Sequence, residues 1–312
     1  MKLILRIIGY VLGIVVLLAI VGGGYLYFQL RKQLRDGGKI VEWNDSYGTI
    51  YRDLRYGDGS RHTFNLIIPA HKHPSAVMLF LHGGSWTSGE KEDMEYEAYR
   101  YAKQGYATAV MNYSRLGVDT LDYTTQYRQP NFQSMMQEIT MAIEAIKREG
   151  ATRGCDFTQM AIGGYSAGGH LAMLYATRHA AEAAIPIRFQ ISWVGPSDLN
   201  ILFPTSEEEI ANLFNNPTQE NQKQIDELRH FLHHIVGRDF SPEELRSEGM
   251  IGSIKSIGSP LHHVSAATPP AILAYGGADR LVDKEHGNTW PPHSMWLAWK
   301  TNYSSSPTQV TY

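Results

Sequence analysis

Short apolar runs alternate with helical patterns along most of this chain. Each run has the length of a strand, and the one at residues 76–81 is apolar throughout, as in a strand that is buried on both faces of a sheet. These runs lie at residues 76–81, 106–112, 159–162, 187–194 and 271–275. Apolar positions at helical spacing predict helices between them, at residues 91–103, 132–148 and 171–180. This alternation predicts an α/β fold, a mostly parallel sheet with helices on both faces.

A hairpin and an insertion interrupt the alternation. Residues 47–56 and 61–68 alternate aromatic or β-branched with polar residues around the turn Gly57-Asp58-Gly59, which predicts an antiparallel hairpin. Residues 198–258 begin with polar stretches and contain a helical pattern at residues 224–236. We therefore expect a helical cap insertion at about 198–258. It is either a lid over a substrate or a structural excursion, and the sequence favours neither.

The N-terminal segment has a composition of its own. Residues 7–30 carry no charge and are long enough to span a bilayer, which takes about 20 apolar residues. A cleaved signal peptide is the alternative, but Tyr25–Phe28 prolongs the apolar run beyond the usual length. We predict an uncleaved membrane anchor at 1–32, a linker at 33–46 and one α/β domain at 47–312.

Basic residues flank both ends of the apolar segment about equally, so they determine the orientation poorly. A very short N-terminal tail is usually the part left inside. We therefore expect a single-pass membrane protein that contacts the lipid bilayer through residues 7–30, with its α/β domain outside the cytoplasm.

Composition excludes several classes of function. The 312 residues suffice for one large α/β domain, and a net charge of −3 gives no electrostatic reason for nucleic-acid binding. Cys155 is the only cysteine, which excludes an internal disulfide and a cysteine-cluster metal site. No HExxH spacing occurs either, so we predict no metal and no cofactor.

The segment Gly164-Tyr165-Ser166-Ala167-Gly168 carries the most specific chemistry. It has the G-x-S-x-G pattern between a predicted strand and a predicted helix. A serine at so sharp a turn stands clear of the sheet, and flanking glycines leave space that a Cβ would fill. The unpaired N–H groups that begin the next helix suit a developing oxyanion. Ser166 is thus a candidate nucleophile, and a glycine-rich turn that only packs tightly is the alternative.

Three further motifs occur at the ends of predicted strands. They are His82-Gly83-Gly84-Ser85-Trp86, Asn112-Tyr113-Ser114-Arg115-Leu116 and Gly276-Gly277-Ala278-Asp279-Arg280-Leu281-Val282. With the serine motif, and in this order, they make the chain resemble the α/β-hydrolase superfamily from about residue 47 to the end. The resemblance is to the esterase group that includes hormone-sensitive-lipase-like, feruloyl or acetyl-xylan esterase-like and kynurenine-formamidase-like enzymes.

This resemblance implies a role for each motif. Ser166 is expected to be the nucleophile, and Asp279 the acid that orients a histidine, although a turn-forming aspartate is the alternative there. The backbone amides of Gly83, Gly84 and Ala167 are expected to form the oxyanion hole. The implied reaction is hydrolysis of a small-molecule carboxylic ester through an acyl-enzyme on Ser166. An amide or peptide hydrolase with the same groups is a weaker alternative.

The histidine of the triad is not identified. The superfamily places it after the last strand, which residues 308–312 are predicted to form. A fragment or frameshifted product of a longer esterase is the leading expectation. The alternatives are a catalytically dead relative that acts as a binding protein, or His286 or His293 as the base. We expect structural roles for the two histidines within the motifs, His82 in support of the oxyanion loop and His170 in local packing or bonding.

Overall fold

The computed structural model describes residues 43–70, 73–121, 129–203, 206–215 and 218–275, and the single positions 282, 286 and 290. The chain divides into two compact units, Met1–Trp43 and Asn44–Tyr312, and the elements below belong to the second. The predicted anchor at residues 7–30 and residues 33–42 of the linker lie outside the described residues. Within the described part of the chain, no helix is both long and apolar enough to cross a membrane.

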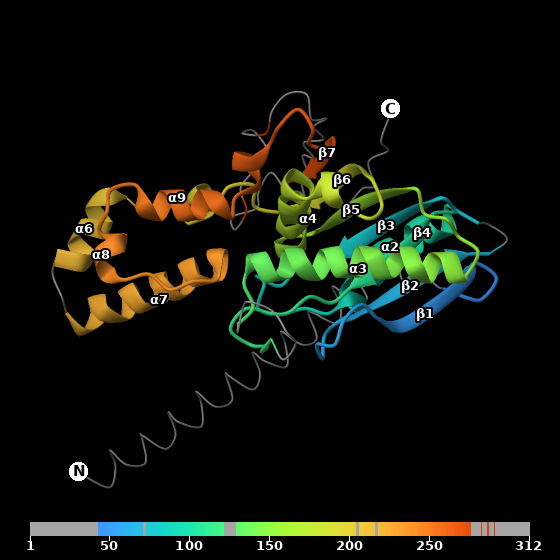
Figure 1. The fold of residues 1–312 in the computed structure, drawn as a ribbon, viewed down its shortest axis with the longest axis horizontal. Coiled ribbons are helices and arrows are strands. Elements are labelled where there is room, and N and C mark those ends of the chain that lie inside the picture. Colours follow the sequence, from blue (N-terminus) through green and yellow to red (C-terminus); the bar gives the residue numbers. More distant parts are fainter. Residues whose placement is uncertain are drawn as a thin grey trace, which may run out of the picture. The chain divides into compact units, whose positions relative to one another are not determined.

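The described strands form one seven-stranded sheet in the order β1-β2-β4-β3-β5-β6-β7 (Figure 1). The strands are β1 (Gly48–Arg55), β2 (Thr63–Pro69), β3 (Ala76–Leu81), β4 (Ala107–Met111), β5 (Gln159–Tyr165), β6 (Ile187–Trp193) and β7 (Ala271–Ala274). Strands β1 and β2 pair antiparallel, as the hairpin pattern predicts, and β2 pairs antiparallel with β4. The remaining pairs are parallel, so the mostly parallel sheet expected from the sequence is confirmed.

Helices cover both faces of this sheet. A short 3-10 turn η1 (Lys91–Met94) leads into α2 (Glu95–Lys103), and α3 (Phe132–Thr152) and α4 (Ala167–Arg178) follow later in the chain. Parallel crossovers are right-handed. The β3–β4 connection runs across the sheet in the opposite direction to the β4–β5 and β5–β6 connections. Helix α2 therefore lies on one face, and α3 and α4 lie together on the other (Figure 1).

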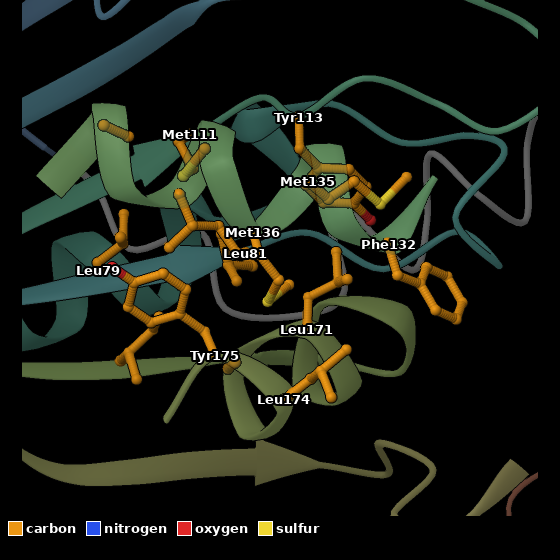
Figure 2. Packing of buried hydrophobic residues seen from close by; sticks show 14 of the residues in the cluster. Leu79, Leu81, Met111, Tyr113, Phe132, Met135, Met136, Leu171, Leu174 and Tyr175 are labelled. Atoms are coloured by element: carbon orange, nitrogen blue, oxygen red, sulfur yellow. The ribbon is translucent and has the colours of Figure 1, made fainter. Parts of the chain in front are cut away.

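The core between the sheet and these two helices fixes the position of α4. Figure 2 shows side chains of β3, α3 and α4 pointing toward one another there. The labelled residues are Leu79, Leu81, Met111, Tyr113, Phe132, Met135, Met136, Leu171, Leu174 and Tyr175, all fully or nearly fully buried. Burying one such side chain contributes about 1.5–3 kcal/mol, so this contact holds the first turn of α4 against the end of β3.

A group of helices joins β6 to β7. A 3-10 turn η2 (Ala180–Glu182) follows α4, and a further one, η3 (Pro260–His263), precedes β7. Between β6 and β7 lie α5 (Leu199–Leu202), α6 (Glu207–Asn215), α7 (Gln219–Val236), α8 (Pro242–Leu245) and α9 (Met250–Ile257). This is where the sequence predicts a helical cap insertion, and α6 to α9 group beside the sheet in Figure 1. The predicted helix at 294–300 and strand at 308–312 lie outside the described residues.

Candidate active site

Ser166 occupies the sharp turn between β5 and α4. Its backbone has φ 51° and ψ −117°, a conformation that is strained for a residue with a Cβ. The turn is held on both sides, because the Ser166 N–H donates to the Trp193 carbonyl at 2.8 Å and its carbonyl accepts from the His170 N–H at 2.9 Å. The side chain is only partly buried. Ser166 is therefore an accessible hydroxyl on a rigid, strained turn.

The flanking glycines allow α4 to approach β3 closely. A Cβ on Gly164 would lie 2.4 Å from the Leu81 carbonyl oxygen, and a Cβ on Gly168 would lie 2.1 Å from the same atom. A Cβ on Gly168 would also lie 2.5 Å from the carbonyl oxygen of His82. Such distances are too short for carbon–oxygen contacts, so both positions require glycine. The first turn of α4, with the amide of Ala167, thus lies beside the loop that follows β3.

Gly83 brings that loop next to the nucleophile. A Cβ on Gly83 would lie 3.5 Å from Ser166 Cβ and 3.1 Å from the carbonyl oxygen of Tyr165. The backbone of Gly83 therefore lies directly beside the serine turn. The structure brings Ser166, Ala167 and Gly83 together at the carboxyl ends of β3 and β5, and Gly84 follows within the same loop.

The loop after Gly83 turns back through three residues in the left-handed region. Gly84, Ser85 and Trp86 have φ values of 116°, 51° and 61°. The carbonyl of Gly84 accepts the N–H groups of Thr87 and Ser88 at 3.0 and 2.9 Å, which closes the turn. Two successive non-glycine residues with positive φ store strain that the surrounding contacts must offset.

His170 has a structural role within this assembly. The indole N–H of Trp86 donates to its Nδ1 at 3.2 Å, and its Nε2 donates to the carbonyl of Gly258 at 2.7 Å. Burial lowers the pKa of His170 to about 4, so the ring is neutral. It connects the loop after β3 to the end of the helical insertion. The bonding expected from the sequence is present, but it reaches distant parts of the chain and is not local.

His82 is likewise buried and neutral. Its Nδ1 lies 2.8 Å from the carbonyl oxygen of Gly83. Burial is the main cause that lowers the pKa of His82 to about 4, and the Arg61 guanidinium lowers it further. These contacts fit the supporting role expected for His82.

His286 accepts a backbone hydrogen bond at Nδ1, the nitrogen from which a triad base donates. It is buried, and its Nδ1 accepts the N–H of Ser197 at 3.2 Å. A neutral imidazole with Nδ1 as acceptor is protonated at Nε2, whereas a triad base accepts at Nε2 and donates from Nδ1. In this arrangement Nδ1 of His286 is engaged with the backbone of Ser197. Asp279 and His293 lie outside the described residues.

Arg61 is a buried contact of this region that sequence analysis does not single out. Its side chain is only 10% exposed and donates from Nε to the carbonyl of Tyr113 at 2.9 Å and from Nη2 to that of Gly89 at 3.0 Å. Glu90 pairs with its Nη1 at 2.8 Å. No motif marks it, because a charged residue beside a hairpin strand ordinarily faces solvent.

A cavity of about 390 Å³ lies elsewhere on the sheet. Its lining includes Ala76, Gln159 and Arg188, which stand at or near the amino ends of β3, β5 and β6. Ser166 follows the carboxyl end of β5, so this cavity is at the opposite edge and does not serve the serine. Among the described residues, no three histidine, cysteine or acidic side chains gather as metal ligands.

Three comparisons bear on this geometry. The BD-FAE family model matches residues 65–233, which is more than half of the chain. The protein named "Probable isoprenylcysteine alpha-carbonyl methylesterase ICME", from Oryza sativa subsp. japonica, is 28% identical over 145 residues, covering 46% of this chain. The match spans only 32% of that relative's length.

Solved structures share the fold. Esterase B from Lactobacillus rhamnosis, crystallised with a C6-C4 SN3 inhibitor, superposes with a TM-score of 0.60 at 18% identity and covers 91% of this chain and 84% of its own. A bacterial heroin esterase gives a TM-score of 0.54 at 20% identity, covering 85% and 75%. At these identities the likeness establishes the α/β-hydrolase fold.

Proposed function

The chain belongs to the BD-FAE family, an esterase-like family of α/β-hydrolases, and from this premise we propose that it is a serine esterase with Ser166 as its nucleophile. One observation carries the proposal above the others. Ser166 stands on a strained turn at φ 51°, and the backbone of Gly83 approaches so closely that a Cβ there would lie 3.5 Å from Ser166 Cβ. Nucleophile and oxyanion donors need this proximity.

The reaction follows from these positions. Ser166 Oγ attacks the ester carbonyl carbon, and its proton passes to a base. The carbonyl oxygen becomes an oxyanion that accepts hydrogen bonds from the amides of Gly83, Gly84 and Ala167, each worth about 2.7–4 kcal/mol in the transition state. The alcohol leaves with a proton, and water then releases the acid from the acyl-enzyme.

In the same proposal, Asp279 orients the histidine that acts as the base and stabilises its charge. Loss of the histidine from a serine triad lowers turnover by about 10⁶-fold, and about 10³–10⁴-fold over water persists from the oxyanion hole and binding. A measured rate therefore tells whether a base is present as well as whether Ser166 acts.

A carboxylic ester is the substrate class that the comparisons support. The names of the similar proteins describe a methylesterase, an esterase B and a heroin esterase. The fold itself does not discriminate an ester from an amide, because both reactions use the same nucleophile and donors. We propose a small-molecule ester.

We also propose that residues 7–30 anchor the protein in a membrane, with the catalytic domain outside the cytoplasm. The support is the uncharged apolar stretch, long enough to span a bilayer, with basic residues on both flanks. Membranes washed with alkaline carbonate should retain the chain, and deletion of residues 7–30 should release it. Full recovery of the intact chain in the wash would contradict the anchor.

Labelling with a fluorophosphonate tests the central proposal. The full chain in detergent micelles should react once, and mass spectrometry should locate the adduct on Ser166. Ser166→Ala should abolish the adduct, whereas Ser253→Ala, at an exposed serine on α9, should leave it unchanged. Hydrolysis of short acyl nitrophenyl esters that survives Ser166→Ala would contradict the proposal. A folded chain without labelling would favour the non-catalytic binding protein.

A further inference from the structure

Two peptide groups carry the amides of Gly83 and Gly84. In a planar trans peptide the carbonyl and the N–H point in opposite directions. A side chain that holds the carbonyl of His82 therefore sets the direction of the Gly83 N–H. In the same way, a side chain that holds the carbonyl of Gly83 sets the direction of the Gly84 N–H.

Tyr113 holds the first of these peptides. Its hydroxyl donates to the carbonyl of His82 at 2.8 Å. The tyrosine is fully buried, and its ring stacks on the His82 imidazole with centroids 4.1 Å apart and planes inclined by 11°. The hydroxyl has no freedom to seek water there, so the carbonyl of His82 is fixed and the Gly83 N–H points away from Tyr113.

The imidazole of His82 holds the second peptide. Its Nδ1 lies 2.8 Å from the Gly83 carbonyl oxygen, so the bond exists only when Nδ1 carries the proton. Gly89 leaves the space for this contact, because a Cβ there would lie 2.4 Å from both atoms. The tautomer of His82 therefore decides whether the Gly84 N–H is oriented.

Arg61 selects that tautomer. Its Nη2 bonds the Gly89 carbonyl at 3.0 Å and Asn112 Oδ1 at 3.3 Å and lies 3.4 Å from His82 Nε2. Because a guanidinium only donates, its position beside Nε2 favours the tautomer with the proton on Nδ1. The same guanidinium donates to the backbone carbonyls of Tyr113 and Gly89. One largely buried cation thus contacts both ends of the oxyanion loop, at His82 and Gly89, and Tyr113 in the segment that follows β4.

We propose that Tyr113 and Arg61 are positioning residues of the oxyanion hole. Tyr113 acts through the carbonyl of His82 on the Gly83 N–H, and Arg61 acts through the tautomer of His82 on the Gly84 N–H. The inference rests on the proposed function of Ser166 and Gly83. It adds two side chains that touch no substrate and yet set the direction of the donors that do.

The expected effect is on the transition state. Removal of a whole oxyanion donor lowers kcat by about 10²–10³-fold. When a donor is present but its direction is no longer fixed, we expect a smaller effect, a decrease of about 10- to 100-fold in kcat with KM little changed.

Tyr113→Phe tests the first peptide, with Tyr275→Phe as the matched control. Tyr275 is also buried and donates its hydroxyl to a backbone carbonyl, that of Gly195, at 2.6 Å. Both variants of the full chain should lose similar stability, but only Tyr113→Phe should lower kcat. A thionoester should suffer less than the matching ester, because sulfur accepts N–H bonds weakly. Equal losses on both substrates, or in both variants, would overturn the proposal.

Arg61→Gln tests the second peptide without relying on turnover. In the wild-type full chain, ¹⁵N spectra should show His82 protonated at Nδ1, and Arg61→Gln should admit the Nε2 tautomer. A wild-type proton on Nε2 would overturn the inference. If the wild type shows no Ser166-dependent turnover, the proposed function fails, and the His82 tautomer still decides whether the loop is held as described.

Discussion

Ser166→Gly should stabilise the protein while it abolishes activity. The wild-type serine has φ 51° and ψ −117°, which glycine adopts without a steric penalty. Strain of this kind costs about 1–3 kcal/mol at a single residue. Glycine also gives the unfolded chain more freedom, which costs about 0.4–1 kcal/mol in return. The balance predicts a gain of about 1 kcal/mol in the free energy of unfolding.

Ser166→Ala is the matched control for this strain. Alanine keeps the Cβ and hence the strain, and it also removes the nucleophile. The Ser166 hydroxyl makes no capping bond to α4, so its loss should not weaken the helix. Ser166→Ala should therefore stay close to wild type in stability, and both variants should be inactive.

Urea unfolding of the full chain in detergent, followed by tryptophan fluorescence, measures the difference. Trp86 lies in the adjoining loop after β3, and the backbone carbonyl of Trp193 accepts the Ser166 N–H, so both tryptophans report on this region. Ser166→Gly should unfold at higher urea than Ser166→Ala with the same slope. If Ser166→Gly is no more stable than Ser166→Ala, the turn is not strained and the argument for a preorganised nucleophile loses its main support.

Two further predictions concern pH and packing. Burial lowers the pKa of His82 and His170 to about 4, below the usual 6.5. The unfolded chain therefore binds protons at these rings before the folded chain does, so the free energy of unfolding is highest above pH 6.5 and falls as pH drops toward 4. Urea unfolding at pH 5 should show about 2 kcal/mol less stability per histidine than at pH 8, and equal stabilities would contradict this. Gly168→Ala should lose about 2–3 kcal/mol because its Cβ meets the Leu81 carbonyl at 2.1 Å, whereas Gly252→Ala, with only a 3.8 Å neighbour, should gain up to about 1 kcal/mol. A neutral Gly168→Ala would exclude the close approach of α4 to β3.

The sheet and its main helices follow from local pattern. A continuous apolar run is decisive for β3, because a strand covered on both faces is apolar throughout, and β4 and β5 are nearly as apolar, whereas apolar and polar residues alternate in β6. The helix predicted at 132–148 is observed at Phe132–Thr152, and it begins where the Asn131 side chain accepts the Ser134 N–H. The helix ends later than predicted, at Thr152, because its apolar spacing ends before the helix does.

The serine turn could be predicted for a similar reason. Gly164, Ser166 and Gly168 lie within five residues, so strand, turn and helix are specified locally. The base could not be identified in this way, because its partner groups come from distant segments. His286 was a candidate by sequence distance alone, and only its contact with Ser197 reveals that Nδ1 is an acceptor.

The positioning of the oxyanion donors lies between these two cases. Strands β3 and β4 are parallel neighbours with Leu81 opposite Met111, so the residues that follow them emerge side by side. Sheet order alone therefore brings Tyr113 next to the loop of His82, so the position of Tyr113 could be predicted once that order was known.

Arg61 is different. It precedes β2, and nothing in its neighbourhood shows that its guanidinium turns inward. A buried cation is tolerable only where several acceptors converge, and those acceptors come from the loops after β3 and β4 and from Glu90. Its proposed role is thus a property of the assembled loops, which no local pattern around Arg61 could indicate.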